Sequence, residues 1–205
     1  KSKRSNSRSV GMALRICFIG DSITNGYGDP EYRGWPSYLS SQALRVGCDI
    51  TAYNLGVRSD TSSLILGRWR NEAAARLPAE MPAALVFAFG INDCACIDGV
   101  RRVEPTQTMA NTEAILGAAT TWLPTIFVGP TPIDGARTTP QFLPGKTLEI
   151  SNDLIADMNA RLQALCGGPE IVSAVVLHRE PAKSRYLPDS RGTVLEPQFS
   201  RRPKG

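Results

Sequence analysis

The sequence predicts an α/β protein in which a doubly wound, mainly parallel sheet lies between two layers of helices, a three-layer α/β/α architecture. Short runs of branched and aromatic residues alternate along the chain with longer stretches of helical spacing, and most of the short runs end at a glycine or a polar turn. This alternation favours a parallel sheet with helices on both faces. The 205 residues, 42% hydrophobic and 20% charged, suffice for one domain with a substantial core.

Two strand–helix pairs are expected in the first part of the chain. Leu14–Ile19 is a β-rich run that ends at a glycine, which is typical of a strand followed at once by a turn. Pro36–Val46 has helical spacing, with proline suited to a first helical turn and a glycine after the last residue to end the helix. Asp49–Asn54 reads as a second strand. Ser59 or Asp60 can cap a helix that follows this second strand and runs towards Leu77, before Pro78.

The alternation continues in the second part of the chain. Leu85–Phe89 is mostly apolar, as expected for a strand covered on both faces. A helix over Thr106–Trp122 and a strand over Thr125–Val128 follow, and Leu148–Leu165 has the spacing of another helix. Ile133–Lys146 is rich in proline, glycine and threonine, so we expect a long loop there that can cover a site.

The two ends of the chain differ from the body. Ile171–Leu177 can add one more strand, but residues 179–205 show no sustained apolar periodicity and are rich in arginine, proline and serine. We therefore expect a basic N-terminal extension or tag remnant over residues 1–11, a folded domain over residues 12–178 and an irregular tail over residues 179–205.

Charge and hydropathy exclude several classes of function. The net charge is +4, yet residues 12–165 hold 12 basic and 15 acidic residues, so the basic excess lies at the chain ends. A nucleic-acid site more often shows a basic stripe on the folded body, so no nucleic-acid partner is expected. The longest apolar run, Ala83–Phe89, suits a buried strand and is too short to span a membrane. The oligomeric state is left open.

The cysteines bear on the compartment and on metal binding. Their odd number and ordinary spacing argue against a disulfide framework and favour a reducing compartment, so a cytoplasmic location is expected. The five are Cys17, Cys48, Cys94, Cys96 and Cys166. Cys94-Ala95-Cys96 resembles half of a metal site, but no second cysteine pair accompanies it and the chain has one histidine. No metal and no cofactor are expected.

Three predicted strand ends carry residues suited to acyl transfer. Gly20-Asp21-Ser22-Ile23 places a serine on a tight turn, where its hydroxyl enters the crevice and its own N–H can face a developing oxyanion. At the second strand end Gly56 lets another N–H approach closely, and at the third the Asn92 amide is a neutral donor. Each such donor contributes about 3 kcal/mol to the stabilisation of a tetrahedral intermediate. Each motif alone is more often structural, as a capped turn or a polar loop, than catalytic.

With these blocks the sequence resembles the SGNH (GDSL-type) hydrolases over roughly residues 14–165. Gly20–Ile23 is similar to the first block of that family, Gly56 to the second and Gly90–Asp93 to the third. The resemblance implies a flavodoxin-like SGNH hydrolase fold and a serine esterase. It implies that Ser22 is the nucleophile, and that Ser22, Gly56 and Asn92 supply the oxyanion hole. Asp93 is then expected to orient its loop, while Tyr27, Tyr32 and Trp35 can line the pocket or belong to the core or a lid.

One block of that family is not recognisable. The family has Asp-X-X-His near the C-terminus, where histidine is the general base that a serine needs. The only histidine here is His178, and Val175 stands three residues before it. Glu180 and Asp189 can orient His178 only if the fold brings them close. Two explanations fit: the protein retains the pocket without the base, or the reading frame has slipped near residue 166.

Two hypotheses about function follow. In the first, the protein hydrolyses small-molecule carboxylic esters, as a lipase/acylhydrolase or small-acyl esterase, through an acyl-enzyme on Ser22. In the alternative it is a catalytically impaired SGNH-like binding protein that lacks the general-base histidine.

Overall fold

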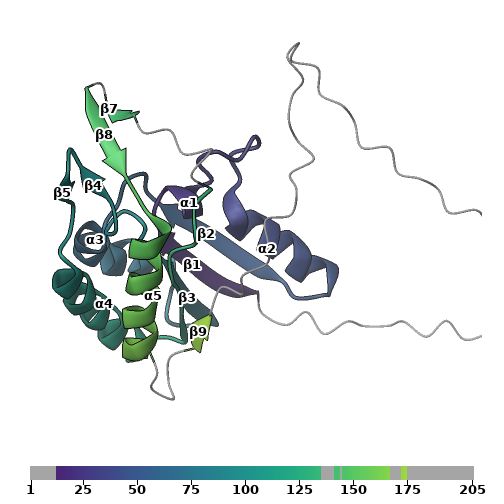
Figure 1. Cartoon of the computed structure of the whole chain (residues 1–205). Helices are drawn as coiled ribbons and strands as arrows, with labels where there is room; N and C mark the ends of the chain where they lie inside the picture. The colour runs from purple at the N-terminus through teal and green to yellow at the C-terminus, as the bar shows by residue number, and fades with distance from the viewer. Residues whose placement is uncertain (1–12, 135–140, 144, 167–171, 175–205) are drawn as a thin grey trace, which may run out of the picture.

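A five-stranded parallel sheet forms the centre of the computed structural model, which describes residues 13–134, 141–143, 145–166 and 172–174 (Figure 1). Its strand order is β2-β1-β3-β6-β9, and every neighbouring pair is parallel. The strands are β1 (Leu14–Gly20), β2 (Ile50–Gly56), β3 (Ala83–Ala88), β6 (Thr125–Val128) and β9 (Val172–Ala174). The four predicted strands as far as Val128 are confirmed within a few residues at their ends. Of the predicted strand Ile171–Leu177, the described residues Val172–Ala174 form β9, and the rest lies outside the described residues.

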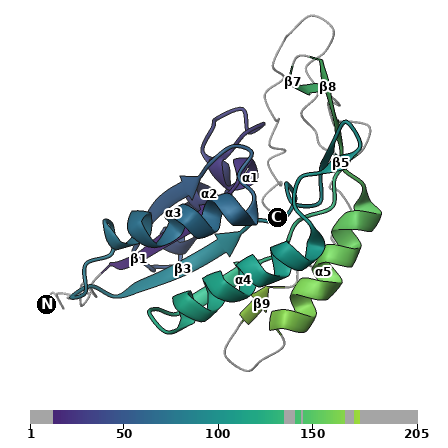
Figure 2. The ribbon, with the colours of Figure 1, turned by 90° about the vertical axis from the view of Figure 1, so that its left-hand side faces the viewer.

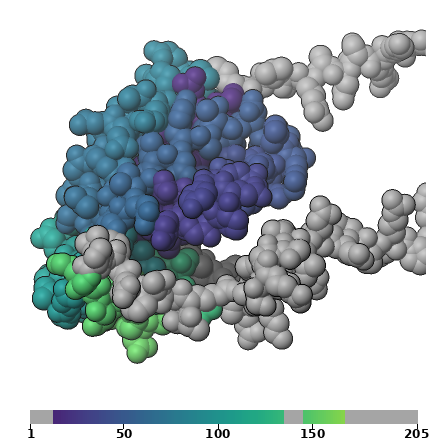
Figure 3. All heavy atoms as spheres, turned by 90° about the horizontal axis from the view of Figure 1, so that it is seen from above, coloured from purple at the N-terminus to yellow at the C-terminus, as the bar shows by residue number. Residues whose placement is uncertain are grey.

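Helices cover both faces of the sheet. The helices are α1 (Ser22–Asn25), α2 (Gly34–Arg45), α3 (Ser62–Ala74), α4 (Pro105–Thr120) and α5 (Asn152–Cys166). Successive side chains of β1 point to opposite faces: Cys17 and Ile19 pack in a core with α3, α4 and α5, whereas Ile16 and Phe18 pack in a smaller cluster with Trp35 of α2. Figure 2 shows α4 and α5 side by side. In the space-filling view of Figure 3, the green residues lie at the lower left edge of the molecule and the blue N-terminal residues lie above them. The predicted three-layer α/β/α fold is confirmed.

A second, small sheet was not predicted from the sequence. Its order is β5-β4-β8-β7, and all its pairs are antiparallel. The strands are β4 (Cys96–Ile97), β5 (Val100–Arg101), β7 (Gln141–Leu143) and β8 (Lys146–Glu149). Figures 1 and 2 show this sheet projecting at the end of the molecule where α1 lies.

The small sheet corrects two predictions. The stretch Ile133–Lys146, expected to be a loop without strands, contains β7 and the first residue of β8. The helix expected from Leu148 begins at Asn152 instead, because Leu148 and Glu149 pair with Ile97 and Cys96 of β4. Unlike β6, these strands lack a run of branched and aromatic residues, so their sequence alone does not reveal them.

No helix among the described residues is both long and apolar enough to cross a membrane.

All five cysteines are described, and none of them forms a disulfide. Cys17, Cys94 and Cys166 are buried in the core, and burial raises the pKa of the Cys94 thiol to about 12. The protonated Cys94 thiol lies 3.7 Å from the carbonyl oxygen of Leu154.

Candidate functional site

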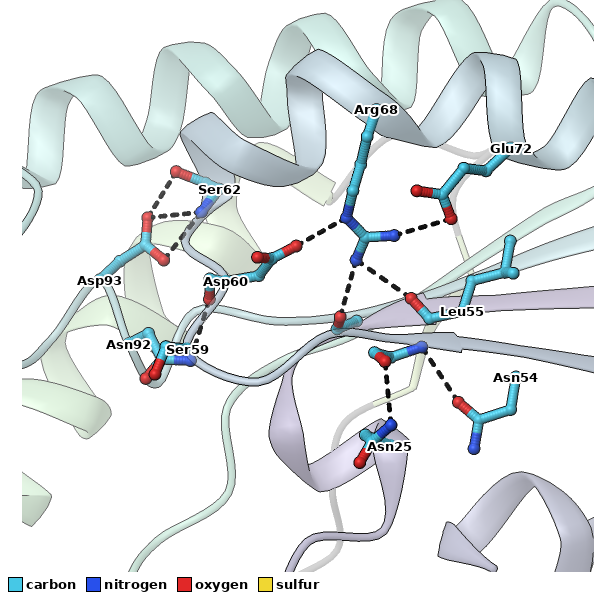
Figure 4. Close-up of polar contacts among 12 residues, drawn as sticks. Asn25, Asn54, Leu55, Ser59, Asp60, Ser62, Arg68, Glu72, Asn92 and Asp93 are labelled. Carbon is cyan, nitrogen blue, oxygen red and sulfur yellow. Dashed lines mark hydrogen bonds and ion pairs between the residues drawn. The ribbon is translucent and has the colours of Figure 1, made fainter. Parts of the chain in front are cut away.

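Three segments meet at the carboxyl edge of the central sheet. In the parallel register Gly20 at the end of β1 lies opposite Gly56 of β2 and Ala88 of β3. The segments that follow these strands therefore begin side by side, as Figure 4 shows for the residues after β2 and β3. The predicted site residues Ser22 and Asn92 belong to two of these segments. This edge is where open α/β sheets bind ligands.

Ser22 is the first residue of α1, the short helix that β1 enters directly. Asp21 is the N-cap, and its Oδ1 accepts a hydrogen bond of 2.9 Å from the N–H of Ile23. Ser22 is half-buried. Neither its hydroxyl nor its N–H has a hydrogen-bond partner within the part of the chain that the structure describes. The residue therefore offers a hydroxyl and a backbone donor that are both open.

The carboxyl group of Asp21 lies in an unfavourable environment for its charge. Asp21 is only 2% exposed, and burial raises its pKa to about 6. The hydrogen bond from Ile23 opposes this rise, whereas the carboxyl groups of Asp93 and Asp60 add to it. Asp21 is therefore ionised at neutral pH at a free-energy cost to the folded state.

Gly56 is the point where α1 packs against the end of β2. A Cβ atom on this residue would lie 2.2 Å from the backbone nitrogen of Asn25 and 2.8 Å from the carbonyl oxygen of Asp21. The Gly56 N–H donates to Oδ1 of Asn54 at 3.0 Å, and its carbonyl accepts from the Asn25 side chain at 3.1 Å. Since its N–H is already engaged, this geometry conflicts with the predicted role of Gly56 as a free oxyanion donor.

Ser59, which the sequence suggested only as a helix cap and not as an oxyanion donor, has the open backbone donor of this segment. Its φ angle is +66°, in the left-handed region that non-glycine residues rarely adopt. The Ser59 carbonyl accepts from the Arg102 guanidinium at 2.8 Å, and across the described ranges no acceptor is present for its N–H. Nothing in a Val-Arg-Ser-Asp run reveals this, because the φ angle is set by the contacts that close the loop.

Asn92 is buried, and both ends of its side-chain amide are held. Its Nδ2 donates to the carbonyl oxygen of Asp60 at 2.9 Å, and its Oδ1 accepts from the Arg102 guanidinium at 3.1 Å. An amide nitrogen carries two hydrogens, so one N–H remains for a ligand after the bond to Asp60. Figure 4 shows Asn92 beside Ser59.

Asp93 anchors its loop and accepts a hydrogen bond from the first N–H of α3, a helix to which it does not belong. Its carboxylate accepts from the Ser62 N–H at 3.1 and 3.0 Å, from the Ser62 hydroxyl, and from the Thr108 hydroxyl at 3.1 Å (Figure 4). Burial raises the pKa of Asp93, and these hydrogen bonds oppose that rise.

The predicted cap at Ser59 or Asp60 is wrong: the N-cap of α3 is Thr61, which makes no capping bond with its own side chain.

Arg68 of α3 links the ends of β1 and β2 to Asp60. Its Nε lies 2.6 Å from Asp60, and one terminal nitrogen donates to the carbonyls of Gly20 and Leu55, each at 3.0 Å (Figure 4). Asp60 thus pairs with Arg68 and not with Arg58, its near neighbour in the sequence. Arg58 instead stacks on an exposed tyrosine, Tyr27, with its guanidinium carbon 3.9 Å from the ring centroid.

An apolar cavity of about 330 Å³ lies beside the turn that carries Ser22. Its lining includes Asp21 and Ile23 on either side of Ser22, Trp35 of α2, and Ile91 and Pro130, which follow β3 and β6. Trp35 thus lines the cavity while its ring packs on Phe18 at a centroid distance of 5.2 Å. The cavity lies at the lower end of the size range of small-molecule sites, which is roughly 300–1,000 Å³.

The candidate general base lies outside the described residues. His178, Glu180 and Asp189 all fall in that part of the chain, as does Val175. No histidine is present in the described ranges, and these ranges contain no group of three metal-binding side chains.

The chain matches the GDSL-like Lipase/Acylhydrolase family over residues 18–192, a range that includes the segment after residue 165 and His178. An arylesterase from Vibrio mimicus is 29% identical over 101 residues, which cover 47% of this chain and 44% of that esterase. The chain thus spans less than half the length of this curated relative.

Solved structures of similar proteins have the same fold. AlinE4, an SGNH-hydrolase family esterase, matches with a TM-score of 0.60 at 21% identity over 90% of both chains. The lipase/acylhydrolase from Enterococcus faecalis gives 0.57 at 24% identity, covering 75% of this chain and 71% of that one. A G-D-S-L family lipolytic protein from Veillonella parvula gives 0.58 at 20% identity over 78% of each. Together with the family match over most of its length, this fold establishes that the chain belongs to the GDSL-like (SGNH) lipase/acylhydrolase family.

Proposed function

We propose that the protein hydrolyses carboxylic esters of small molecules, with Ser22 as the nucleophile. The observation that carries this proposal is the open hydroxyl and open N–H of Ser22 at the carboxyl edge of the sheet, on the first of the three segments that meet there. Family membership supports ester hydrolysis as the reaction.

The proposed reaction proceeds through an acyl-enzyme. The Ser22 hydroxyl attacks the acyl carbon, its proton passes to a base, and the carbonyl oxygen becomes an oxyanion. The alcohol then leaves with a proton, and water attacks the acyl group on Ser22 to release the acid and restore the hydroxyl.

Three donors are proposed for the oxyanion: the N–H of Ser22, the N–H of Ser59 and the second N–H of the Asn92 amide. Ser59 replaces Gly56 in this set because the Gly56 N–H already bonds Asn54 at 3.0 Å, whereas the Ser59 N–H is open in the described structure. Loss of one such donor typically lowers kcat by about 10²- to 10³-fold. Gly56 acts in this proposal by letting α1 approach β2.

The substrates are proposed to carry short acyl groups. The cavity of about 330 Å³ begins at the residues on either side of Ser22, and apolar side chains make up most of its lining. A cavity at the lower end of the usual size range suits a small apolar group better than a long chain. The similarity to an arylesterase makes aryl esters the first substrates to test.

Hydrolysis of p-nitrophenyl acetate tests this function. We expect the wild-type chain to release p-nitrophenol and Ser22→Ala to lose about 10³-fold or more of the rate. Ser41→Ala, which removes an exposed hydroxyl of α2, is the matched control and should keep the wild-type rate. Equal rates for Ser22→Ala and the wild type would contradict the proposal.

The second candidate is a binding protein that uses the same site without turnover. It is favoured by one observation: the only histidine, His178, lacks an aspartate three residues before it. This candidate predicts that acetate binds and that no p-nitrophenol is released even at high protein concentration. In the esterase reading, with His178 as the base, His178→Ala lowers the rate nearly as far as Ser22→Ala does. An active His178→Ala variant would remove His178 as the base.

A further inference from the structure

Arg102 connects two of the proposed oxyanion donors through one guanidinium. It follows β5 of the small sheet, and its backbone N–H is fixed by a 2.9 Å bond to the carbonyl of Ala95. One terminal nitrogen donates to Oδ1 of Asn92 at 3.1 Å, and the other donates to the carbonyl of Ser59 at 2.8 Å. The side chain is half-buried. Asn92 and Ser59 lie 33 positions apart in the sequence but share this single partner.

The contact with Arg102 fixes which way the Asn92 amide faces. A guanidinium only donates hydrogen bonds and a carbonyl oxygen only accepts them. Because Arg102 contacts one end of the amide and the Asp60 carbonyl contacts the other, a flipped amide would lose both bonds. The unused N–H of Asn92 is thereby kept in one direction.

The contact with Ser59 holds a strained backbone. A serine at a φ of +66° leaves this conformation easily unless its surroundings hold it. The bond from Arg102 to the Ser59 carbonyl is charge-assisted, and such bonds are about twice as strong as neutral ones. The open N–H of Ser59 is therefore held in place by the same side chain that orients Asn92.

We propose that Arg102 is a positioning residue that aligns the Ser59 and Asn92 donors of the oxyanion site; this inference rests on the proposed function. In this proposal Arg102 acts through its bonds to the two donors. Arginine suits this role because its planar fork reaches two acceptors at a fixed spacing, which the single ammonium of lysine does not reproduce. The inference also gives the small sheet a role, since β4 and β5 carry Arg102 to the site.

Kinetics of the full chain with p-nitrophenyl acetate test the role in catalysis. Arg102→Met should lower kcat about 10- to 100-fold while KM changes less than about threefold, because the donors act mainly in the transition state. Arg102→Lys should recover only part of the loss. Arg101→Met, which removes the neighbouring guanidinium on β5, is the matched control and should keep the wild-type kcat. A wild-type kcat in folded Arg102→Met overturns the inference.

A second measurement does not depend on turnover. The side-chain NH₂ resonances of Asn92, identified by their loss in Asn92→Asp, should shift in Arg102→Met and stay in place in Arg101→Met. Unchanged resonances in Arg102→Met would overturn the inference even if activity falls. If Ser22→Ala keeps full activity, the proposed function fails, and the NMR result then decides separately whether Arg102 orients Asn92.

Discussion

Burial of the carboxyl group next to Ser22, the proposed nucleophile, has a measurable consequence at the scale of single residues. Asp21 is 2% exposed, and its pKa is raised from 3.8 to about 6 in the folded protein. A raised pKa means that the folded state binds the proton more tightly than the unfolded state. The stabilising contribution is therefore complete below about pH 4 and is lost as the pH rises through about 6.

Asp21→Asn should remove this pH dependence. Asparagine retains an oxygen that can accept the Ile23 N–H but carries no charge. We expect the free energy of unfolding of the variant to exceed that of the wild type by about 1–3 kcal/mol near pH 8, and to match it near pH 4. Urea unfolding at both pH values measures this, with the exposed Asp49→Asn as control. A wild-type pH dependence in Asp21→Asn would contradict the assignment.

The sequence pointed to some residues of the candidate site and not to others. Ser22 and Asn92 lie a few residues after predicted strand ends, so a motif at each strand end indicated them. Ser59 could not be found in this way, because its proposed role depends on a positive φ angle and on a contact with Arg102. The sequence also does not show which arginine pairs with Asp60. The partner is Arg68 of α3, eight residues later, and not the near neighbour Arg58.

At the scale of elements, the contact between α1 and β2 holds the nucleophile turn. Gly56→Ala would place a Cβ atom 2.2 Å from the backbone nitrogen and 2.7 Å from the Cα of Asn25. Backbone atoms cannot rotate away as a side chain can, so α1 has to shift. We expect a loss of about 1–3 kcal/mol in the free energy of unfolding, and a lower esterase rate because Ser22 moves with α1.

Gly67→Ala is the matched control for this substitution. Gly67 is an exposed glycine inside α3, and a Cβ atom there meets nothing within 4 Å. Alanine in an open helical position should stabilise the protein by about 0.5–1 kcal/mol. Chemical denaturation compares the two variants. Gly56→Ala with wild-type stability and activity would show that this packing does not hold the turn.

Elements could be predicted where their own residues carry a pattern. The runs that became β1, β2, β3 and β6 have enough branched and aromatic residues to be found, and α2 and α5 have helical spacing. The strands β4, β5, β7 and β8 contain two to four residues each and exist because they pair with one another. The helical spacing of the residues in α5 extends back to Leu148, so the sequence predicts a helix from that residue. The pairing of Leu148 with Ile97 of β4 places it in a strand instead.

At the scale of the whole molecule, the parallel sheet brings three short motifs together at one candidate site. Residues 22, 59 and 92 are distant in the sequence, yet β1 lies between β2 and β3, so the segments after these three strands emerge next to one another. The alternation of strands and helices predicted this sheet, and the rule that ligands bind at its carboxyl edge predicted the place of the site. The small sheet then adds Arg102 to it.

The most direct test of the central claim is the covalent state of Ser22 during turnover. The full chain is mixed with p-nitrophenyl acetate, quenched within the first turnover, and analysed by mass spectrometry of its peptides. We predict that one acetyl group forms on Ser22 as a burst of p-nitrophenol is released, and that Ser22→Ala gives no acetylated peptide. Turnover with an unmodified Ser22 in the quenched wild type, and at the same rate in Ser22→Ala, would contradict it.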